Sequence, residues 1–340
     1  MQFDSLRFKL TAGVALFIAI SISVMTAVGW FSMNQNNQSA SKLLNSSMQQ
    51  QAEIILTDAA AGIAFETEAL INRNFDLALN LAAKLSATAH GQAIQPYSRE
   101  QVQALVAELL KTNAGISSMY SHFEANGYDN ADAQFTSGFA HSSPTGTLEV
   151  YWVREGNQFK FVPTLTPESK YAAAKNAAGV REAEWYLCSR DSKKPCLMEP
   201  YLWEISAGNS VLLTSLVAPV VVQGEFRGVA GVDMNLPVLQ TLLEKQAKNL
   251  YGGEAKLYLL STHGLLLASN QFPNQLGQSL SSLDPELAKH LQNASAEIAR
   301  FGEELVISRH LSVEAATADW QVVVTVPEQV AMAVATQLKQ

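Results

Sequence analysis

The protein is a chain of 340 residues with a formal net charge of −8 at pH 7, and 48% of its residues are hydrophobic. A chain of this length can bury a substantial core and form two domains. Its lysines and arginines form no dense cluster, so the sequence disfavours binding to DNA or RNA.

The first feature along the chain is an uncharged apolar segment, Leu10–Met33. Because roughly 20 apolar residues suffice to cross a bilayer, residues 10–33 are predicted to form a transmembrane helix. Arg7 and Lys9 precede it, which places residues 1–9 in the cytoplasm and the rest of the chain outside. The alternative is a cleaved signal peptide, whose apolar core would be shorter, roughly 7–15 residues, and would end at a small-residue cleavage site.

Residues 34–90 are predicted to form one long helix that continues from the membrane segment. They contain no proline, and apolar residues recur at helical spacing until Gly91 and Pro96 end the pattern. We expect this helix to begin near Gln35 and to end near Ala89. A continuous helix that leaves a membrane anchor can carry a small displacement between an outer domain and the bilayer.

The rest of the chain alternates strands with short helices in two successive cycles. A helix is predicted directly after Ser98, which is a favourable N-cap residue, and strand and turn patterns follow it. A further helix at 237–250 separates these strands from a second group. The expected fold is therefore α+β, with a long N-terminal helix that carries two antiparallel-sheet lobes, at 91–236 and 251–326. Residues 327–340 are predicted to begin a helix that leads to a second membrane span beyond this sequence.

Both cysteines of the chain lie in the segment 182–204, "EAEWYLCSRDSKKPCLMEPYLWE". Outside the cytoplasm, where the compartment is oxidising, Cys188 and Cys196 are predicted to form a disulfide. A bond that closes so short a loop stabilises the fold by about 2–3 kcal/mol in the chain-entropy model. Two free thiols are the alternative. A metal site is disfavoured, because the spacing does not match a zinc knuckle and no histidine lies nearby.

The order of these features resembles a known sensor domain. The N-terminal anchor, the long helix, "WYL…EPYL…VLLTSLVAPVVVQGEFRGVAGVDMNL" and "ADWQVVVTVP" are similar to the periplasmic double Cache domain of bacterial methyl-accepting chemotaxis proteins. The resemblance covers nearly the whole chain and is strongest over 184–236. It implies two PAS-like lobes, a small-molecule ligand in the membrane-distal first lobe, and a homodimer in the inner membrane with its sensor in the periplasm. Cytoplasmic signalling partners would be reached only through a region beyond this sequence.

The resemblance also implies where a ligand binds. In the amino-acid-binding branch of the family, an arginine two residues before a Trp-Tyr pair binds the ligand carboxylate. In this sequence the pair is Trp185–Tyr186, but the arginine position holds Ala183 and the next residue is Glu184. Arg181 lies two residues too early. The pattern is therefore closer to the branch that binds amines.

The amino-acid-binding branch binds the ligand ammonium with a later tyrosine and with an aspartate at a strand end, which correspond to Tyr201 and Asp233. Carboxylates accept charge-assisted hydrogen bonds from an ammonium group, and each aromatic face adds about 0.5–2 kcal/mol of cation–π attraction. We therefore predict that the first lobe binds a biogenic amine or polyamine. The predicted ligand-binding residues are Glu184, Trp185, Tyr186, Tyr201, Trp203 and Asp233. Weaker candidates are Tyr151, Tyr171, Arg181 and Glu199.

Several alternatives to this prediction stay open. If the segment around Trp185 and Tyr186 is extended, the two side chains point to opposite sides and only one faces a ligand. Glu184 could be solvated, and Asp233 could simply cap the next helix. The ligand could be an amino acid bound through Arg181. The same sensor could serve a histidine kinase or a nucleotide cyclase, or the chain could be a ligand-free membrane-anchored scaffold.

No sequence pattern indicates catalysis. The chain has six histidines, none of them spaced to share a metal ion, and it lacks a G-x-S-x-G motif and a phosphate-binding loop. The "GGEA" at 252–255 departs from the nucleotide-cyclase signature. We therefore expect neither an enzyme nor a bound metal or cofactor.

Overall fold

The structure is a computed structural model, and it describes residues 3–136, 140–176, 179–206, 208–293, 298–316 and 318–337. The chain divides into two compact units. One consists of Met1–Ile55 with Met332–Gln340, and the other is Leu56–Ala331.

The first unit contains the N-terminal part of helix α1 and most of helix α7. Helix α1 runs without interruption over Phe3–Thr88, so the apolar segment and the long helix expected after it are one element. From Phe8 onward α1 is long and apolar enough to cross a membrane, and the side chains of its most apolar stretch are exposed. Helix α7 spans Glu328–Gln337.

The second unit begins with the C-terminal part of α1, which has buried apolar side chains and makes hydrogen bonds to the region of the first sheet. Leu56, Phe75 and Leu85 on this part are fully buried. Asn74 Nδ2 donates a hydrogen bond to the carbonyl of Gly115, ahead of the first sheet, and Ser86 Oγ accepts one from the amide of Val221 within it.

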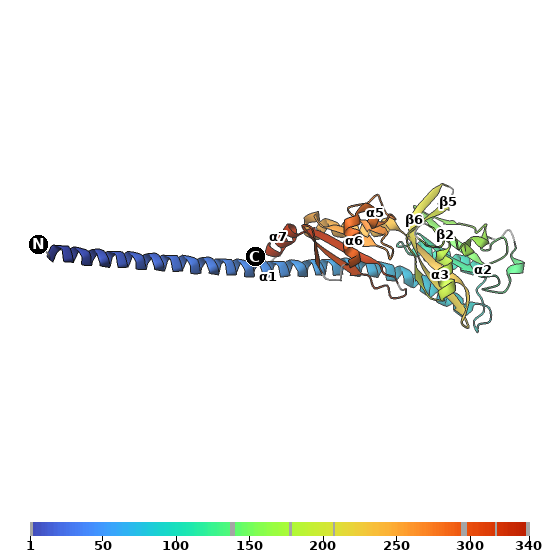
Figure 1. Cartoon of the computed structure of the whole chain (residues 1–340). Coiled ribbons are helices and arrows are strands. Elements are labelled where there is room, and N and C mark those ends of the chain that lie inside the picture. Colours follow the sequence, from blue (N-terminus) through green and yellow to red (C-terminus); the bar gives the residue numbers. More distant parts are fainter. Residues whose placement is uncertain are drawn as a thin grey trace. The chain divides into compact units, whose positions relative to one another are not determined.

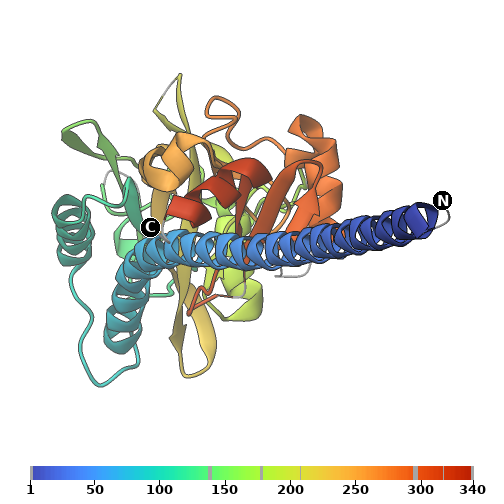
Figure 2. The ribbon, with the colours of Figure 1, turned by 90° about the vertical axis from the view of Figure 1, so that its left-hand side faces the viewer.

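The first sheet has seven antiparallel strands in the order β3-β2-β1-β7-β6-β4, with β5 paired to β6. Figure 1 labels β2, β5 and β6 of this sheet. The strands are β1 Ser118–Phe123, β2 Glu149–Glu155, β3 Gln158–Phe161, β4 Cys196–Leu197, β5 Tyr201–Ser206, β6 Asn209–Val222 and β7 Glu225–Asn235. The long hairpin of β6 and β7 is yellow in Figure 2. Gln223 and Gly224 form its turn with positive φ angles of 50° and 82°. Together with its helices, this sheet forms the first lobe.

Three helices and two short 3-10 turns accompany the first sheet. Helix α2 spans Arg99–Thr112 and begins with the expected N-cap, since Ser98 and Gln101 form a reciprocal capping box. Helix α3 spans Glu184–Ser192, so the segment around Trp185 is helical. The 3-10 turns are η1 Asp132–Gln134 and η2 Pro167–Tyr171. Helix α4, Leu236–Asn249, leads from β7 to the second lobe.

The second lobe is built on a five-stranded antiparallel sheet in the order β10-β11-β12-β8-β9. Its strands are β8 Lys256–Leu260, β9 Leu266–Ser269, β10 Ala299–Phe301, β11 Glu304–His310 and β12 Gln321–Pro327. The 3-10 turn η3 Leu250–Gly253 and the helices α5 Leu280–Leu283 and α6 Pro285–Asn293 complete it. Apolar side chains from β8, β9, β12 and α6 form its core.

Candidate ligand-binding cavity

The candidate site lies on one face of the first sheet, and the strand register determines which residues reach it. Alternate residues of a strand point to the same face. On β1, Ser118, Tyr120 and His122 share this face. Across the ladders, Ser118 pairs with Asp233 on β7, and His122 pairs with Glu149 on β2. Polar pairs therefore lie at both ends of this part of β1, and the Tyr120 ring lies between them.

A glycine on β7 makes room for that ring. Gly231 lies directly opposite Tyr120, and a Cβ atom at this position would lie 2.2 Å from Tyr120 Cζ. Real Cβ atoms do not approach a ring so closely, so any larger residue would displace Tyr120. Gly231, the second glycine of "GVAGVD", is therefore required for packing against the Tyr120 ring on the neighbouring strand.

These residues line a cavity of about 480 Å³. Its floor is the sheet, and its walls are the segment after β3, turn η2, helix α3 and strand β5. Its lining consists of Tyr120, His122, Glu149, Tyr151, Val162, Pro163, Thr164, Leu165, Thr166, Pro167, Ser169, Lys170, Trp185, Tyr201, Trp203, Glu204 and Asp233.

One end of the cavity, here called the aspartate end, is formed by Asp233 and two serines. Ser215 Oγ donates a hydrogen bond of 2.6 Å to Asp233 Oδ1, and Ser118 Oγ donates another to Oδ2. Burial raises the pKa of Asp233 to about 6, although the two hydroxyl donors oppose the shift. Among the described residues, no lysine, arginine or histidine forms an ion pair with it. At neutral pH this carboxylate is a buried anion that no described cationic side chain neutralises.

Aromatic rings surround the middle of the cavity. Tyr120 makes edge-to-face contacts with Tyr151 and Trp185, at centroid distances of 6.0 Å and 5.5 Å. Trp203 contacts Tyr151 at 6.3 Å and Tyr201 at 6.4 Å. The hydroxyl groups of Tyr120 and Tyr151 are buried and have no hydrogen-bond partner in the described structure. Unpartnered polar atoms beside a cavity are available to a ligand.

The other end, here called the histidine end, is formed by His122, Glu149 and Lys170. Lys170 Nζ donates hydrogen bonds of 2.6 Å to Glu149 Oε1 and to the carbonyl of Phe123. His122 Nδ1 lies 3.4 Å from Glu149 Oε2. Burial alone would raise the pKa of Glu149, but His122 and Lys170 outweigh it and hold this pKa at about 2. Glu149 is therefore ionised, and Lys170 balances its charge.

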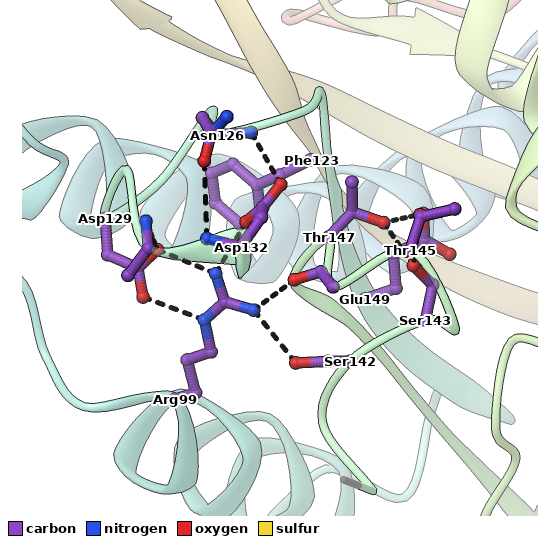
Figure 3. Close-up of polar contacts among 12 residues, drawn as sticks. Arg99, Phe123, Asn126, Asp129, Asp132, Ser142, Ser143, Thr145, Thr147 and Glu149 are labelled. Carbon is purple, nitrogen blue, oxygen red and sulfur yellow. Dashed lines mark hydrogen bonds and ion pairs between the residues drawn. The ribbon is translucent and has the colours of Figure 1, made fainter. Parts of the chain in front are cut away.

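A buried arginine holds the segment that leads to Glu149 (Figure 3). The Arg99 guanidinium forms ion pairs with Asp129 at 2.7 Å and with Asp132 at 2.6 Å, and it also donates to Ser142 Oγ and to the carbonyl of Gly146. These contacts fix the turn before β2. From that turn, Thr147 Oγ1 donates a hydrogen bond of 3.0 Å to Glu149 Oε1.

The structure brings several of the predicted ligand-binding residues together. Trp185, Tyr201, Trp203 and Asp233 all line the cavity, and so does the weaker candidate Tyr151. Trp185 and Tyr186 face different surroundings, although α3 is a helix and not an extended segment. Tyr186 is fully buried in the core, where its hydroxyl donates a hydrogen bond of 2.9 Å to Glu124 Oε1.

The other predicted residues lie outside this cavity. Arg181 donates hydrogen bonds to Glu184 at 2.5 Å and to Asp191 at 2.6 Å, so N–H groups on two edges of its guanidinium are already bonded to acidic side chains of its own segment. Tyr171 is partly exposed and donates to Glu124 Oε2 at 2.6 Å.

Glu199 connects the two lobes. It accepts a hydrogen bond from Ser261 Oγ and lies 3.2 Å from His263 Nδ1, both of the second lobe. It also lines a second cavity of about 350 Å³, together with Arg181 and Glu184. Trp185, Tyr201 and Trp203 border both cavities.

Sequence reasoning missed the histidine end and the central ring of Tyr120. Tyr120 and His122 alternate on a strand that the sequence indicated, so the period-two pattern could have assigned them to one face. Glu149 begins the next strand of the pattern. Lys170 gave no such signal, because it follows an irregular segment and reaches Glu149 only through the tertiary fold.

The predicted disulfide is confirmed. Cys188 on α3 is bonded to Cys196 on β4, with 6.4 Å between their Cα atoms. The bond ties the helix that carries Trp185 to the strand that precedes Tyr201, and so joins two walls of the cavity.

Comparison with known proteins gives relatives among chemoreceptors. No protein-family model matches the sequence. The methyl-accepting chemotaxis protein TlpQ of Pseudomonas aeruginosa is 27% identical over 247 residues, which is 71% of this chain and 34% of TlpQ. The chain thus spans about a third of the length of this relative. These relatives are named as chemoreceptors, and nothing in their names indicates an enzyme.

Solved structures show the fold. The extracellular domain of mmHK1S-Z3, assigned to a histidine kinase, has a TM-score of 0.66 and 21% identity, covering 85% of this chain and 99% of that domain. The ligand-binding domain of the Pseudomonas aeruginosa amino-acid chemoreceptor PctC, in complex with GABA, has a TM-score of 0.53 and 16% identity, covering 81% and 99%. The predicted α+β fold, with a long helix and two antiparallel lobes of the double Cache type, is confirmed.

Proposed function

We propose that this chain is the sensor part of a bacterial transmembrane chemoreceptor and that its first lobe binds a small organic cation, a biogenic amine or polyamine. The observation that carries this proposal is Asp233, a buried carboxylate that has no counterion among the described residues and lies at the end of an aromatic-lined cavity of about 480 Å³. A bound ammonium group supplies the missing positive charge.

The energetics favour a cation over a neutral ligand. A buried carboxylate is costly unless it is paired, and its raised pKa of about 6 reflects that cost. An ammonium group that donates to Asp233 forms a charge-assisted hydrogen bond in a site of low polarity. The faces of Trp185 and Trp203 each add about 0.5–2 kcal/mol of cation–π attraction. The cavity thus replaces the hydration shell of a cation with acidic oxygens and aromatic rings.

An α-amino acid is the second candidate. PctC, which has the same fold, is solved with GABA, and other neighbours of this fold are amino-acid receptors. Against it stands the absence of a cationic partner for an α-carboxylate beside Asp233 among the described residues. Ala183 supplies none, and Arg181 is already paired with Glu184 and Asp191.

The proposed receptor is a homodimer in the inner membrane, with residues 10–33 across the bilayer and both lobes in the periplasm. TlpQ, a relative with chemotaxis in its name, supports this placement. Binding shifts the signalling equilibrium only by the difference between the ligand's affinities for two conformations. Glu199, two residues before Tyr201, gives the cavity wall a polar connection to Ser261 of the second lobe.

Calorimetry of the whole chain in detergent micelles, with a panel of monoamines, diamines and amino acids, tests the proposal. The Asp233→Asn variant keeps the size and loses the charge. We expect it to weaken amine binding by about tenfold to a hundredfold, the effect of one charge-assisted hydrogen bond. Asp76→Asn, on an exposed position of α1, is the matched control and should bind as the wild type does. Flat titrations with every amine, or unchanged binding by Asp233→Asn, would refute the proposal.

A further inference from the structure

We propose that His122 is the second recognition point of the cavity, and that it selects cations carrying a second N–H donor at the end remote from Asp233. The inference rests on the proposed function, since it concerns the other end of the same ligand. Diamines and amines with a distal N–H group belong to the class it selects.

The strand geometry sets the distance between the two recognition points. Ser118, which donates to Asp233, and His122 lie on the same face of β1 and are four residues apart. Because an antiparallel strand rises about 3.4 Å per residue, they are about 14 Å apart along the strand. If the two side chains project from the sheet in parallel, this backbone spacing less a hydrogen bond of about 2.8 Å at each end corresponds to a ligand of about 8 Å. An extended five-carbon diamine matches that length.

The surroundings of His122 leave one ring nitrogen for a ligand. Nδ1 faces Glu149 Oε2 at 3.4 Å, which favours the tautomer with the proton on Nδ1. In the neutral ring Nε2 is then an acceptor, and no described residue donates a hydrogen bond to it. The ring contacts Trp185 at 5.2 Å and Tyr120 at 5.8 Å, and both of these rings line the cavity.

Charge at the histidine end explains why the selected group is a donor and not a carboxylate. Glu149 is buried and ionised, and its Oε2 lies behind the histidine ring. Lys170 neutralises Glu149 but directs its hydrogen bonds to Glu149 and to the Phe123 carbonyl, so its charge is already paired. A ligand carboxylate here would be repelled by the ionised Glu149 and would find no unpaired cation among the described residues. A ligand N–H group could instead donate to the lone pair of His122 Nε2.

The histidine end is also built rigidly enough to discriminate. Glu149 is held by Thr147 as well as by Lys170, and the turn before it is fixed by the buried Arg99 (Figure 3). A recognition group whose supports are themselves hydrogen-bonded loses little conformational freedom when it binds.

Calorimetry on the whole chain in detergent micelles with three probes of matched length tests this inference. The probes are cadaverine, n-pentylamine and δ-aminovalerate, which share the ammonium end and differ only at the far end. We expect the wild type to bind cadaverine about tenfold more tightly than n-pentylamine, since one added hydrogen bond to a charged donor has about this effect. We expect δ-aminovalerate to bind more weakly than n-pentylamine.

The variant His122→Phe keeps the ring and removes both nitrogens. It should abolish the preference for cadaverine over n-pentylamine, and urea unfolding followed by circular dichroism reports whether the variant is folded. The variant His122→Gln retains an acceptor and should keep part of the preference. As a separate readout, the nitrogen NMR signal of His122 Nε2 should shift on addition of cadaverine and stay in place with n-pentylamine.

The outcomes separate this inference from the proposed function. Equal wild-type affinities for cadaverine and n-pentylamine, or equal losses of both in His122→Phe, would overturn the role of His122 and leave amine binding intact. Tightest binding by δ-aminovalerate would assign a carboxylate to the histidine end and overturn it as well. Failure of every probe to bind the wild type would overturn the proposed function itself.

Discussion

The two lobes have the same architecture, yet they differ in what they bury. All the buried arginine, lysine, histidine, aspartate and glutamate side chains belong, within the described residues, to the first lobe: Arg99, His122, Asp132, His141, Glu149, Lys170 and Asp233. The buried polar side chains of the second lobe and of α4 are neutral: Gln240, Ser261, Ser269, Ser308 and Thr325. The second sheet is filled by aliphatic residues such as Leu257 and Val324.

This difference indicates that the two lobes have different roles, with ligand binding assigned to the first lobe. A buried ionised group costs free energy unless it is paired and hydrogen-bonded, so a lobe that only needs to be stable avoids it. In the first lobe most buried charges are paired with one another, and Asp233 is the one that carries a charge into the cavity without a described counterion. The second lobe has no such feature among its described residues. The proposal of a ligand in the first lobe follows from this contrast.

The largest effect on stability is expected from removing Arg99, the buried cation that pairs with Asp129 and Asp132. Arg99→Met leaves Asp129 and Asp132 buried without their partner, which should lower the free energy of unfolding by about 3–5 kcal/mol. Urea unfolding followed by circular dichroism measures it. Lys111→Ala breaks the exposed pair with Glu108 and should cost at most about 1 kcal/mol. Equal effects of the two variants would contradict the view that burial gives the Arg99 network its importance.

A smaller effect is expected from the pH dependence of stability that Asp233 introduces. Its pKa is about 6 in the folded state and about 4 in the unfolded chain, so the folded state binds more protons between these values. Stability should therefore fall as pH rises from about 4 to 6, by about 2–3 kcal/mol from this group. Glu149 acts in the opposite sense at lower pH, because its folded pKa is about 2 and its contribution is lost as pH falls from about 4.

The variant Asp233→Asn isolates this contribution. The difference in unfolding free energy between wild type and variant, measured by urea titration at several pH values, should change between pH 4 and 6 and be constant above. A difference that does not change with pH would show that Asp233 titrates normally and is not desolvated.

The smallest effect is expected in the second lobe. Thr325 on β12 is buried and its hydroxyl has no hydrogen-bond partner in the described structure. Thr325→Val replaces that hydroxyl with a methyl group of similar size, so we expect unchanged stability or a gain of about 1 kcal/mol. Ser215→Ala in the first lobe is the counterpart, because Ser215 donates to Asp233, and it should weaken amine binding. A large loss of stability in Thr325→Val would show that the second lobe also depends on buried polar groups.

The sequence predicted those features that depend on local patterns. The long helix follows from apolar spacing without proline, the start of α2 from Ser98, and the disulfide from two cysteines in an oxidising compartment. The pairing of Trp185, Tyr201 and Asp233 around one cavity came from the family resemblance. Their roles in binding stay predictions until a ligand is measured.

The remaining parts of the site depend on contacts between distant segments. Glu184 was a candidate because acidic residues suit an amine, but its neighbour Arg181 engages it within the same turn. Tyr186 was a candidate by its place beside Trp185, yet the turn of α3 directs it into the core, where Glu124 accepts its hydrogen bond. Lys170 and Glu149 meet across 21 positions of sequence, and no local pattern predicts such a pair.

Proton release on binding tests the central claim most directly, since the account holds that a ligand cation ionises Asp233. Calorimetry with an amine at pH 6, repeated in buffers of different ionisation enthalpy, measures the protons released. Because Asp233 is about half protonated there, the account predicts release of up to about half a proton per ligand by the wild type and none by Asp233→Asn. Amine binding by the wild type without proton release would contradict it.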